Sequence, residues 1–141
     1  MSINVDIHAD SGAFRLTSAF ELPETGISAI FGPSGAGKTT LLRALAGLQP
    51  AVGRISIGDT IWQDETICLP THARHAGYVF QESNLFRHLS VSGNLEYAYK
   101  RVPAEQRRVS MEQAIELLDL QALLNRNSHT LSGGEQQRVA I

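Results

Sequence analysis

The sequence predicts an α/β fold in which a phosphate-binding loop joins a buried strand to a helix. Residues 32–39 read Gly-Pro-Ser-Gly-Ala-Gly-Lys-Thr and match the pattern G-x-x-x-x-G-K-[ST] in full. The apolar run 27–31 before the loop predicts the strand, and leucines at helical spacing over residues 38–48 predict the helix. This order lets backbone N–H groups and a helix N-terminus gather around a polyphosphate. The alternative is a glycine-rich turn that caps an ordinary helix.

The loop and the residue after it supply the candidate phosphate ligands. They are Gly32, Pro33, Ser34, Gly35, Ala36, Gly37, Lys38, Thr39 and Thr40. We expect the Lys38 ammonium to reach the β- and γ-phosphates and the Thr39 hydroxyl to bind a bridging Mg²⁺ ion. Thr40 offers a further hydroxyl to a phosphate oxygen.

The composition permits one domain with a hydrophobic core. The chain has 141 residues, 43% of them apolar, and a net charge of −2, so no basic field indicates a nucleic-acid partner. The single cysteine, Cys68, cannot form an internal disulfide, which fits a reducing compartment. We see no signal peptide, and no run approaches the roughly 20 apolar residues of a membrane span. Membrane association is therefore expected only through a partner.

Alternating residues predict antiparallel strands around the loop. Two alternating runs, 3–8 and 14–22, predict a hairpin with a polar turn between them. Phe14 in the second run is either a core residue or a ring that stacks on the nucleotide base. Further alternation over residues 54–62 predicts a second β segment, with Trp62 as a packing residue.

The apolar run 76–80 predicts another buried strand, which ends at Gln81. Ligands collect at the carboxyl ends of strands in open α/β sheets, so the Gln81 amide is placed to touch a metal ion or a water molecule. The alternative is a glutamine in a surface loop. From residue 85 to about residue 127 the pattern is helical, and Ser110 with Gln113 predicts a capping box.

A second candidate anion site lies near residue 132. Residues 131–136 read Leu-Ser-Gly-Gly-Glu-Gln, in which Ser132 and Glu135 predict another capping box. Gly133 and Gly134 leave the start of that helix uncovered, and a bare helix N-terminus attracts anions. The chain thus carries two such sites, about a hundred residues apart.

Together these motifs resemble those of the nucleotide-binding subunits of ATP-binding cassette (ABC) transporters. Residues 32–39 are similar to their Walker A loop, and Gln81 is similar to their Q-loop glutamine. Residues 131–136 are similar to their LSGGQ signature, with Glu135 inside the motif as in many importers. The resemblance covers essentially the whole chain. It implies an α/β P-loop NTPase fold of ABC type, with an antiparallel β subdomain and a helical insertion.

The resemblance also implies a subdivision of the chain. Residues 1–84 correspond to the β subdomain and P-loop core, residues 85–130 to the helical subdomain, and residues 131–141 to the signature and the start of its helix. Family members continue into a Walker B strand that ends in aspartate and glutamate, which these 141 residues lack. The sequence therefore looks like the N-terminal part of a longer cassette, truncated before that strand. We expect the 141 residues alone to bind nucleotide weakly at best and not to hydrolyse it.

The family motifs assign roles to the matching residues. The implied catalytic residues are Lys38, Gln81 and Ser132, and the implied Mg²⁺ ligands are Thr39 and Gln81. In a head-to-tail dimer, the signature of one chain closes over the ATP held by the P-loop of the other. The signature residues implied to contact that nucleotide are Ser132, Gly133, Gly134 and Gln136.

Finer motifs resemble the ATPase subunits of molybdate importers. They are Gly77–Gln81, Leu85-Phe86, His88–Val91 and Asn94-Leu95. The implied function is an ATP-binding subunit that couples ATP binding and hydrolysis to uptake of an oxyanion, with molybdate as the expected ion. Importers of other oxyanions and of sugars share parts of the pattern and remain alternatives. The implied partners are a second copy, membrane permease subunits and, indirectly, a substrate-binding protein, at the cytoplasmic face of the inner membrane.

Two further classes compete with a transport ATPase. A fragment that binds nucleotide or a partner without turnover is indicated by the missing Walker B carboxylates. The cassette ATPases of DNA maintenance use similar motifs but place long coiled-coil arms between the Q-loop and the signature. Only about 50 residues separate Gln81 from Ser132, without sustained heptads, which disfavours that class.

Overall fold

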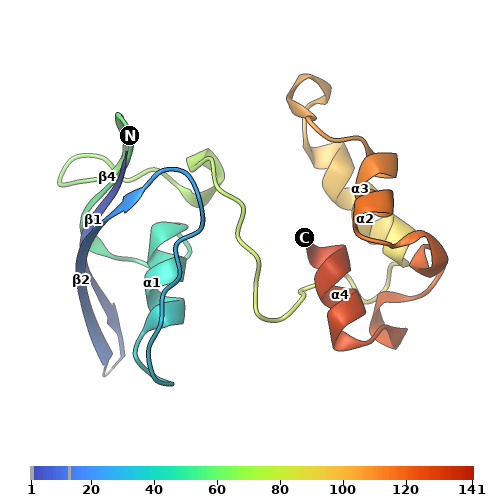
Figure 1. Ribbon diagram of the computed structural model, residues 1–141, viewed down its shortest axis with the longest axis horizontal. Helices are drawn as coiled ribbons and strands as arrows, with labels where there is room; N and C mark the ends of the chain where they lie inside the picture. Colours follow the sequence, from blue (N-terminus) through green and yellow to red (C-terminus); the bar gives the residue numbers. More distant parts are fainter. Residues whose placement is uncertain (1, 13) are drawn as a thin grey trace. The chain divides into compact units, whose positions relative to one another are not determined.

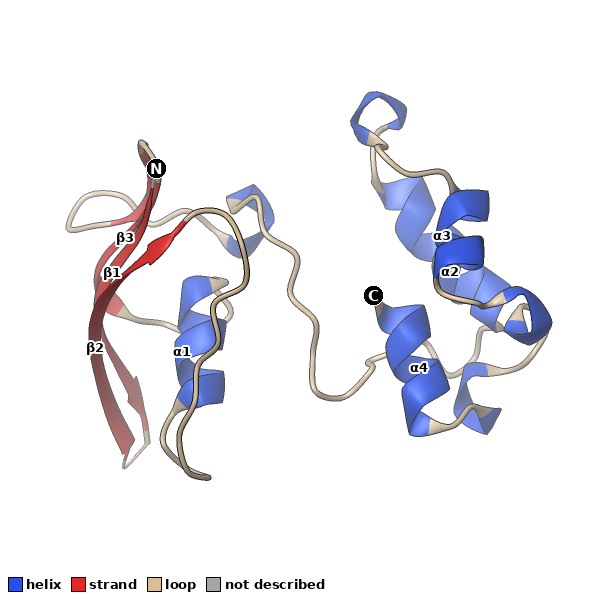
Figure 2. Ribbon diagram, in the orientation of Figure 1, coloured by secondary structure: helices blue, strands red, loops and turns tan. Residues whose placement is uncertain are grey.

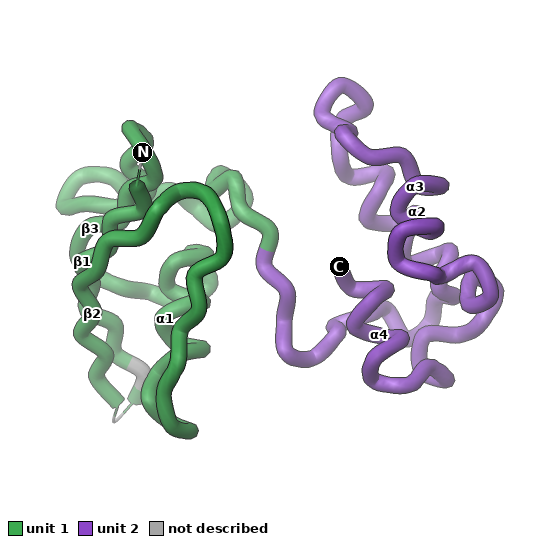
Figure 3. The backbone as a smooth tube through the Cα atoms, viewed as in Figure 1, with its two compact units in different colours: residues 1–77 green, residues 78–141 purple. Residues whose placement is uncertain are grey.

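The computed structural model describes residues 2–12 and 14–141, which divide into two compact units (Figures 1 and 3). Unit 1 extends to Gly77, and unit 2 is Tyr78–Ile141. Each unit has a hydrophobic core of its own. The subdivision at residues 84/85 and 130/131 implied by the family resemblance stays a prediction.

Unit 1 contains a four-stranded antiparallel sheet in the order β2-β1-β3-β4 (Figure 2). Its strands are β1 (Ser2–Ser11), β2 (Phe14–Pro23), β3 (Val52–Ile57) and β4 (Thr60–Gln63). The hairpin predicted from alternation is β1 and β2, and the predicted second β segment is β3 and β4. Both predictions are confirmed.

The inner strand β1 alternates between the core and solvent. Val5 and Ile7 are buried, whereas Asp6 and His8 between and beside them are exposed. On the neighbouring strand, Gly53 has a φ of +115°, and a Cβ there would collide with the carbonyl oxygen of Asp6. Only glycine permits this approach of β3 to β1 without strain.

The helix after the phosphate-binding loop, α1 (Lys38–Leu45), packs against this sheet (Figure 1). It ends earlier than the predicted residue 48, because Gly47 adopts a φ of +74° that a right-handed helix does not allow. The buried core residues of unit 1 are Val5, Ile7, Leu41, Ala44, Ile55 and Trp62. The prediction that Trp62 is a packing residue is confirmed.

Two predicted strands are wrong. Neither 27–31 nor 76–80 forms a strand, and Ile27 and Phe31 are fully exposed. A buried strand obtains its backbone hydrogen bonds from a strand on each side. The four strands of the described chain pair only with one another, so neither segment has a strand beside it there. An apolar run alone does not make a strand without such neighbours.

Unit 2 is helical, as predicted for residues 85–127. Its α-helices are α2 (Val91–Arg101), α3 (Met111–Leu117) and α4 (Gly133–Ala140). Single 3₁₀ turns occur at residues 104–106, 121–123 and 128–130. The buried core residues are Val91, Leu120, Leu123, Leu131 and Val139.

Local capping defines the starts of the helices in unit 2. The Ser110 hydroxyl accepts from the Gln113 main chain, and the Gln113 side chain accepts from the Ser110 N–H, as the predicted capping box requires. Ser90 caps α2 by accepting from the Gly93 N–H.

Within residues 2–12 and 14–141, none of the helices combines the length and apolar character that a membrane span needs.

Candidate functional site

The phosphate-binding loop in unit 1 is closed by its own lysine. The Lys38 ammonium donates to the carbonyl oxygens of Gly32 at 2.8 Å and Pro33 at 2.7 Å. The Ala36 N–H donates to the Pro33 oxygen at 3.3 Å. The side chain of Lys38 therefore folds back across the loop and ties its first two residues to the start of α1.

The N-terminus of α1 is open. Its N-cap is Gly37, which has a φ of +88° and no side chain. Among the described residues, no side chain caps the helix. Thr39 is exposed in the first turn, and Thr40 is half-buried. The exposed loop residues are Pro33, Ser34, Gly35 and Ala36. The loop thus gathers the predicted residues 32–40 around a helix N-terminus whose N–H groups can receive an anion.

An aromatic ring borders the loop. Two ring atoms of Phe14 lie 2.8 Å from where a Cβ would stand on Gly37, so glycine is required there for space as well as for backbone conformation. Phe14 is 37% exposed, which leaves part of the ring available to a ligand. Its two predicted roles, core packing and base stacking, both remain predictions.

The signature motif forms the start of α4 in unit 2. The main-chain N–H and the hydroxyl of Ser132 donate to the Glu135 carboxylate at 2.7 and 2.8 Å, and the Ser132 hydroxyl accepts from the Glu135 N–H. These bonds confirm the predicted capping box. They also lower the pKa of Glu135, chiefly through the main-chain N–H of Ser132 and then through its hydroxyl. The Glu135 carboxylate also forms an ion pair with Arg126, whose Nη1 lies 3.5 Å from Oε1 of Glu135.

The first two residues of α4 are uncovered. A Cβ added to Gly133 or Gly134 would meet nothing of the described chain within 4 Å. The two glycines therefore expose the main chain of the helix start, as predicted. The Ser132 hydroxyl accepts from the Glu135 N–H, so the first-turn donors left open to a ligand are the N–H groups of Gly133 and Gly134.

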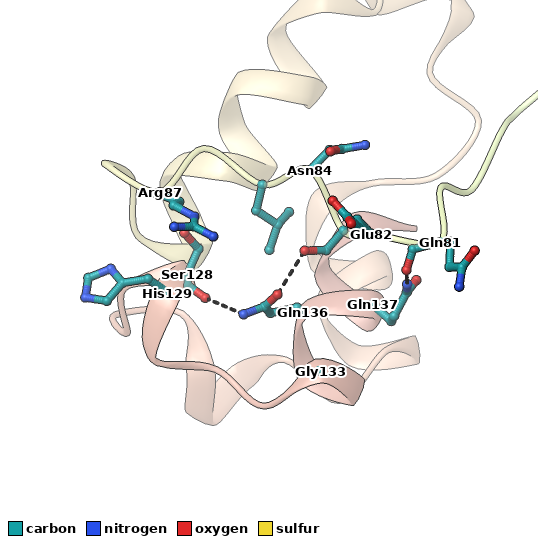
Figure 4. A pocket seen from close by; sticks show the side chains of 11 residues that line it. Gln81, Glu82, Asn84, Arg87, Ser128, His129, Gly133, Gln136 and Gln137 are labelled. Carbon is teal, nitrogen blue, oxygen red and sulfur yellow. Dashed lines mark hydrogen bonds between the residues drawn. The ribbon is translucent and has the colours of Figure 1, made fainter. Parts of the chain in front are cut away.

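Gln81 lies beside α4, within unit 2 (Figure 4). Gln137 of α4 donates from Nε2 to the main-chain oxygen of Gln81 at 2.7 Å and to that of Phe80 at 3.3 Å. The Gln81 side chain is exposed. The structure thus joins the Gln81 segment to the signature helix, whereas the phosphate-binding loop belongs to the other unit.

A pocket of about 710 Å³ lies between the segment from Gln81 to Arg87 and α4 (Figure 4). Gln136 spans it, accepting from the Ser83 hydroxyl at 3.0 Å and donating to the main-chain oxygens of Ser128 and Leu131 at 3.3 and 3.2 Å. The amide of this predicted nucleotide ligand is thus already engaged within unit 2.

Sequence reasoning missed Gln137 and Arg74. Gln137 bonds to main-chain oxygens 56 and 57 positions earlier, and no local spacing rule indicates such a partner. Arg74 is 4% exposed and donates to carbonyl oxygens at the end of α1. A buried arginine without a nearby acidic residue in the sequence offered no pattern to recognise.

A family model described as "ABC transporter" matches residues 17–141. The molybdenum import ATP-binding protein ModC of Pseudomonas fluorescens is 50% identical over 144 residues, covering 100% of this chain and 40% of that protein. ModC of Aromatoleum aromaticum is 55% identical over 131 residues, covering 91% of this chain and 35% of that protein. The chain therefore spans 40% or less of the length of these two relatives.

Solved structures confirm the fold class. The cbiO1 protein of Clostridium perfringens, part of the ABC transporter complex cbiONQ, has a TM-score of 0.74 at 22% identity, covering 98% of this chain and 58% of that one. The dimeric bacterial ABC transporter cassette MJ0796 has a TM-score of 0.63 at 25% identity, covering 100% of this chain and 67% of that one. The predicted α/β cassette fold is therefore correct for the part of the domain that this chain represents.

Proposed function

Because the chain belongs to the ABC transporter family, we propose that it forms part of the ATP-binding subunit of a molybdate importer. The complete subunit would couple ATP binding and hydrolysis to uptake of the ion. The choice of ion rests on relatives named as molybdenum import ATP-binding proteins, at 50% and 55% identity. Importers of other oxyanions or sugars are the alternative.

The observation that carries the proposal is the geometry of the phosphate-binding loop. Lys38 donates two of its three ammonium protons to the carbonyl oxygens of Gly32 and Pro33, which holds its positive charge beside the loop. The uncapped N–H groups of α1 lie beside it. In the proposed complex, phosphate oxygens accept from both sources, and Lys38 stabilises the charge on the transferring γ-phosphoryl group.

The residues proposed to hold Mg²⁺ have suitable chemistry. Thr39 presents an exposed hydroxyl in the first turn of α1, and Gln81 presents an exposed amide. Neutral oxygen donors of this kind, together with phosphate oxygens and water, suit the small, hard Mg²⁺ ion. When bound there, Mg²⁺ would supply positive charge that partly neutralises the phosphates.

The open start of α4 supports the proposed head-to-tail dimer. Ser132, Gly133 and Gly134 would approach the ATP bound by a second copy, which matches the uncovered main chain at that helix start. The related cassette MJ0796 is itself dimeric. A direct contact from the Gln136 amide would require it to leave its partners in unit 2.

The remaining partners follow from family membership. We propose that membrane permease subunits bind the complete protein on the cytoplasmic face of the inner membrane, and that a substrate-binding protein acts indirectly through them. The net charge of −2 supports the absence of a nucleic-acid partner.

A second candidate is a non-hydrolysing, nucleotide-binding fragment. Two observations favour it. The chain spans 40% of the length of the Pseudomonas fluorescens relative, and the predicted strands 27–31 and 76–80 have no neighbouring strand in the described residues. In the first candidate these 141 residues take part in ATP hydrolysis within the complete subunit, whereas in the second they bind nucleotide without turnover.

The test compares the 141-residue chain with the full product of the reading frame that encodes it. ATP binding and hydrolysis are measured for both, with Lys38→Ala and, as the matched control, Lys100→Ala, which removes the other lysine of the chain. We expect the full product to hydrolyse ATP, with a loss of about a hundredfold in Lys38→Ala and less than about twofold in Lys100→Ala. Hydrolysis that survives Lys38→Ala would contradict the proposal.

The proposed ion is tested on the complete transporter. ATP hydrolysis by the subunit, assembled with its permease and binding protein in vesicles, should rise with molybdate. A rise with sulfate or a sugar instead would identify one of the other importers.

A further inference from the structure

Two adjacent glutamines of α4 hold the segment that carries Gln81 (Figure 4). Gln137 donates both protons of its Nε2 atom, one to the main-chain oxygen of Gln81 at 2.7 Å and one to that of Phe80 at 3.3 Å. Gln136 bonds to the Ser83 hydroxyl at 3.0 Å. The segment is therefore attached at points on both sides of Gln81.

These side-chain contacts hold a segment that lies outside the strands of the described chain. Residues 76–80 lie in no strand, so their carbonyl groups receive no ladder hydrogen bonds from a sheet. An irregular segment held by one hydrogen bond can still rotate about that contact. Hydrogen bonds at two separate points also fix the direction in which the backbone of the segment runs. Gln136 and Gln137 are both half-buried; the Gln136 bond to Ser83 is partly buried, whereas the two Gln137 bonds are exposed.

The same helix presents the signature. Ser132 is the N-cap of α4, and Gln137 lies one and a half turns further along it. Any displacement of α4 therefore moves the Ser132 hydroxyl and the backbone of Gln81 together, as long as the Gln137 amide keeps its bonds.

We infer that Gln137 is a positioning residue, which fixes the Gln81 backbone to α4 so that the Gln81 amide and the Ser132 hydroxyl are delivered as one body. This inference rests on the proposed function, in which both groups face ATP. In the proposed complex Gln137 touches neither nucleotide nor metal, and it acts on ATP hydrolysis only through Gln81.

The first test measures the attachment directly, by the backbone NMR order parameters of the chain. Gln137→Met keeps the length and helix propensity of the side chain but removes its donors. We expect the order parameters of residues 80–85 to fall from about 0.85, typical of rigid backbone, toward about 0.6, typical of flexible backbone, with α2 unchanged. The matched control is Gln113→Met, which removes a glutamine that caps α3 and should leave residues 80–85 unaffected.

The second test measures ATP hydrolysis by the full product of the reading frame. Gln137→Met should lower kcat about threefold to tenfold and change KM for ATP by less than about twofold, because the nucleotide contacts of the P-loop remain. Gln81→Ala supplies the other arm of a double-mutant cycle. We expect the double variant to be no slower than Gln81→Ala alone, since Gln137 has nothing left to position.

The outcomes separate this inference from the proposed function. Unchanged order parameters at residues 80–85 in Gln137→Met overturn the inference, and so does an additive cycle, which indicates a general structural role. If the parent protein shows no Lys38-dependent hydrolysis, the proposed function fails. The inferred effect on hydrolysis then fails with it, and the order parameters still decide whether Gln137 holds the Gln81 segment.

Discussion

Arg74 closes the C-terminal end of α1 by donating from Nη1 to the carbonyl oxygen of Ala44 at 2.9 Å. The same nitrogen also bonds to the Leu45 oxygen, Nη2 bonds to the Gln63 side chain, and Nε bonds to the Leu69 oxygen. A guanidinium placed at a helix C-terminus satisfies carbonyl groups that have no partner within the helix, and its positive charge is favourable there. The helix that carries Lys38 is thus held at the end remote from the loop.

We therefore predict that Arg74→Lys destabilises unit 1 by about 1–3 kcal/mol, because an ammonium cannot reproduce the planar fork and leaves buried acceptors without partners. Urea unfolding followed by the fluorescence of Trp62 measures this, since Trp62 is the single tryptophan and lies in the core of unit 1. Arg54→Lys on the exposed face of β3 is the matched control, with an expected change below about 0.5 kcal/mol. Equal stability of Arg74→Lys and the parent would show that the four contacts contribute nothing net.

Gly134→Ala should separate folding from function. Alanine has the higher helix propensity, and its Cβ meets nothing of the described chain, so unit 2 should be unchanged or more stable by up to about 1 kcal/mol. ATP hydrolysis by the complete protein should nevertheless fall at least about tenfold, because the Cβ stands where the proposed dimer brings a phosphate to the helix start. Stability is followed through the tyrosines, all three of which lie in unit 2. Normal hydrolysis in this variant would argue against a role for the uncovered helix start.

Two capping serines form a matched pair. Ser110→Ala and Ser132→Ala each remove an N-cap with a full capping box, so each should cost about 0.5–2 kcal/mol of stability in unit 2. Only Ser132→Ala should lower ATP hydrolysis, because only Ser132 is proposed to face the nucleotide. The comparison uses urea unfolding for both variants and kcat for the complete protein. A similar loss of kcat in both would mean that the effect of Ser132 is one of folding alone.

The carboxylate of Glu135 predicts an acid-sensitive start of α4. Its pKa is lowered from 4.5 because the main-chain N–H and hydroxyl of Ser132 donate to the ionised group. A lowered pKa in the folded state means that the ionised group stabilises the fold. This contribution is present above the unfolded pKa and is lost as the pH falls through the folded pKa.

Glu135→Gln tests this because glutamine can keep the capping box without titrating. We expect the amides of Ser132 and Glu135, which the capping box engages, to lose protection on acidification from about pH 6 to about pH 3 in the parent and to lose less in the variant. Identical acid dependence in the two proteins would exclude Glu135 as the responsible group.

Several features could be predicted because they depend on near neighbours in sequence. The capping box of Ser132 and Glu135 joins residues three apart, and the turn of the phosphate-binding loop depends on Gly37 directly before α1. Alternation along β1 and β2 specified a hairpin whose strands are joined by a short turn. For such features the pattern and the interaction have the same short range.

Other features could not be predicted because their partners lie far along the chain. The apolar runs 27–31 and 76–80 have strand-like composition, but a strand also needs a neighbour to accept its hydrogen bonds. The bond from Gln137 to Gln81 joins residues 56 positions apart, and the bond from Arg74 to Ala44 joins residues 30 positions apart.

The spacing of residues along the chain specifies the phosphate-binding loop, the two capping boxes and the antiparallel hairpin, and the motifs indicate the family. The structure was needed to show that Arg74 binds the end of α1 and that Gln137 attaches the Gln81 segment to α4. Spacing along the chain specifies interactions within a turn or a hairpin. The partner of a long polar side chain is chosen only when packing brings distant segments within about 3 Å of each other.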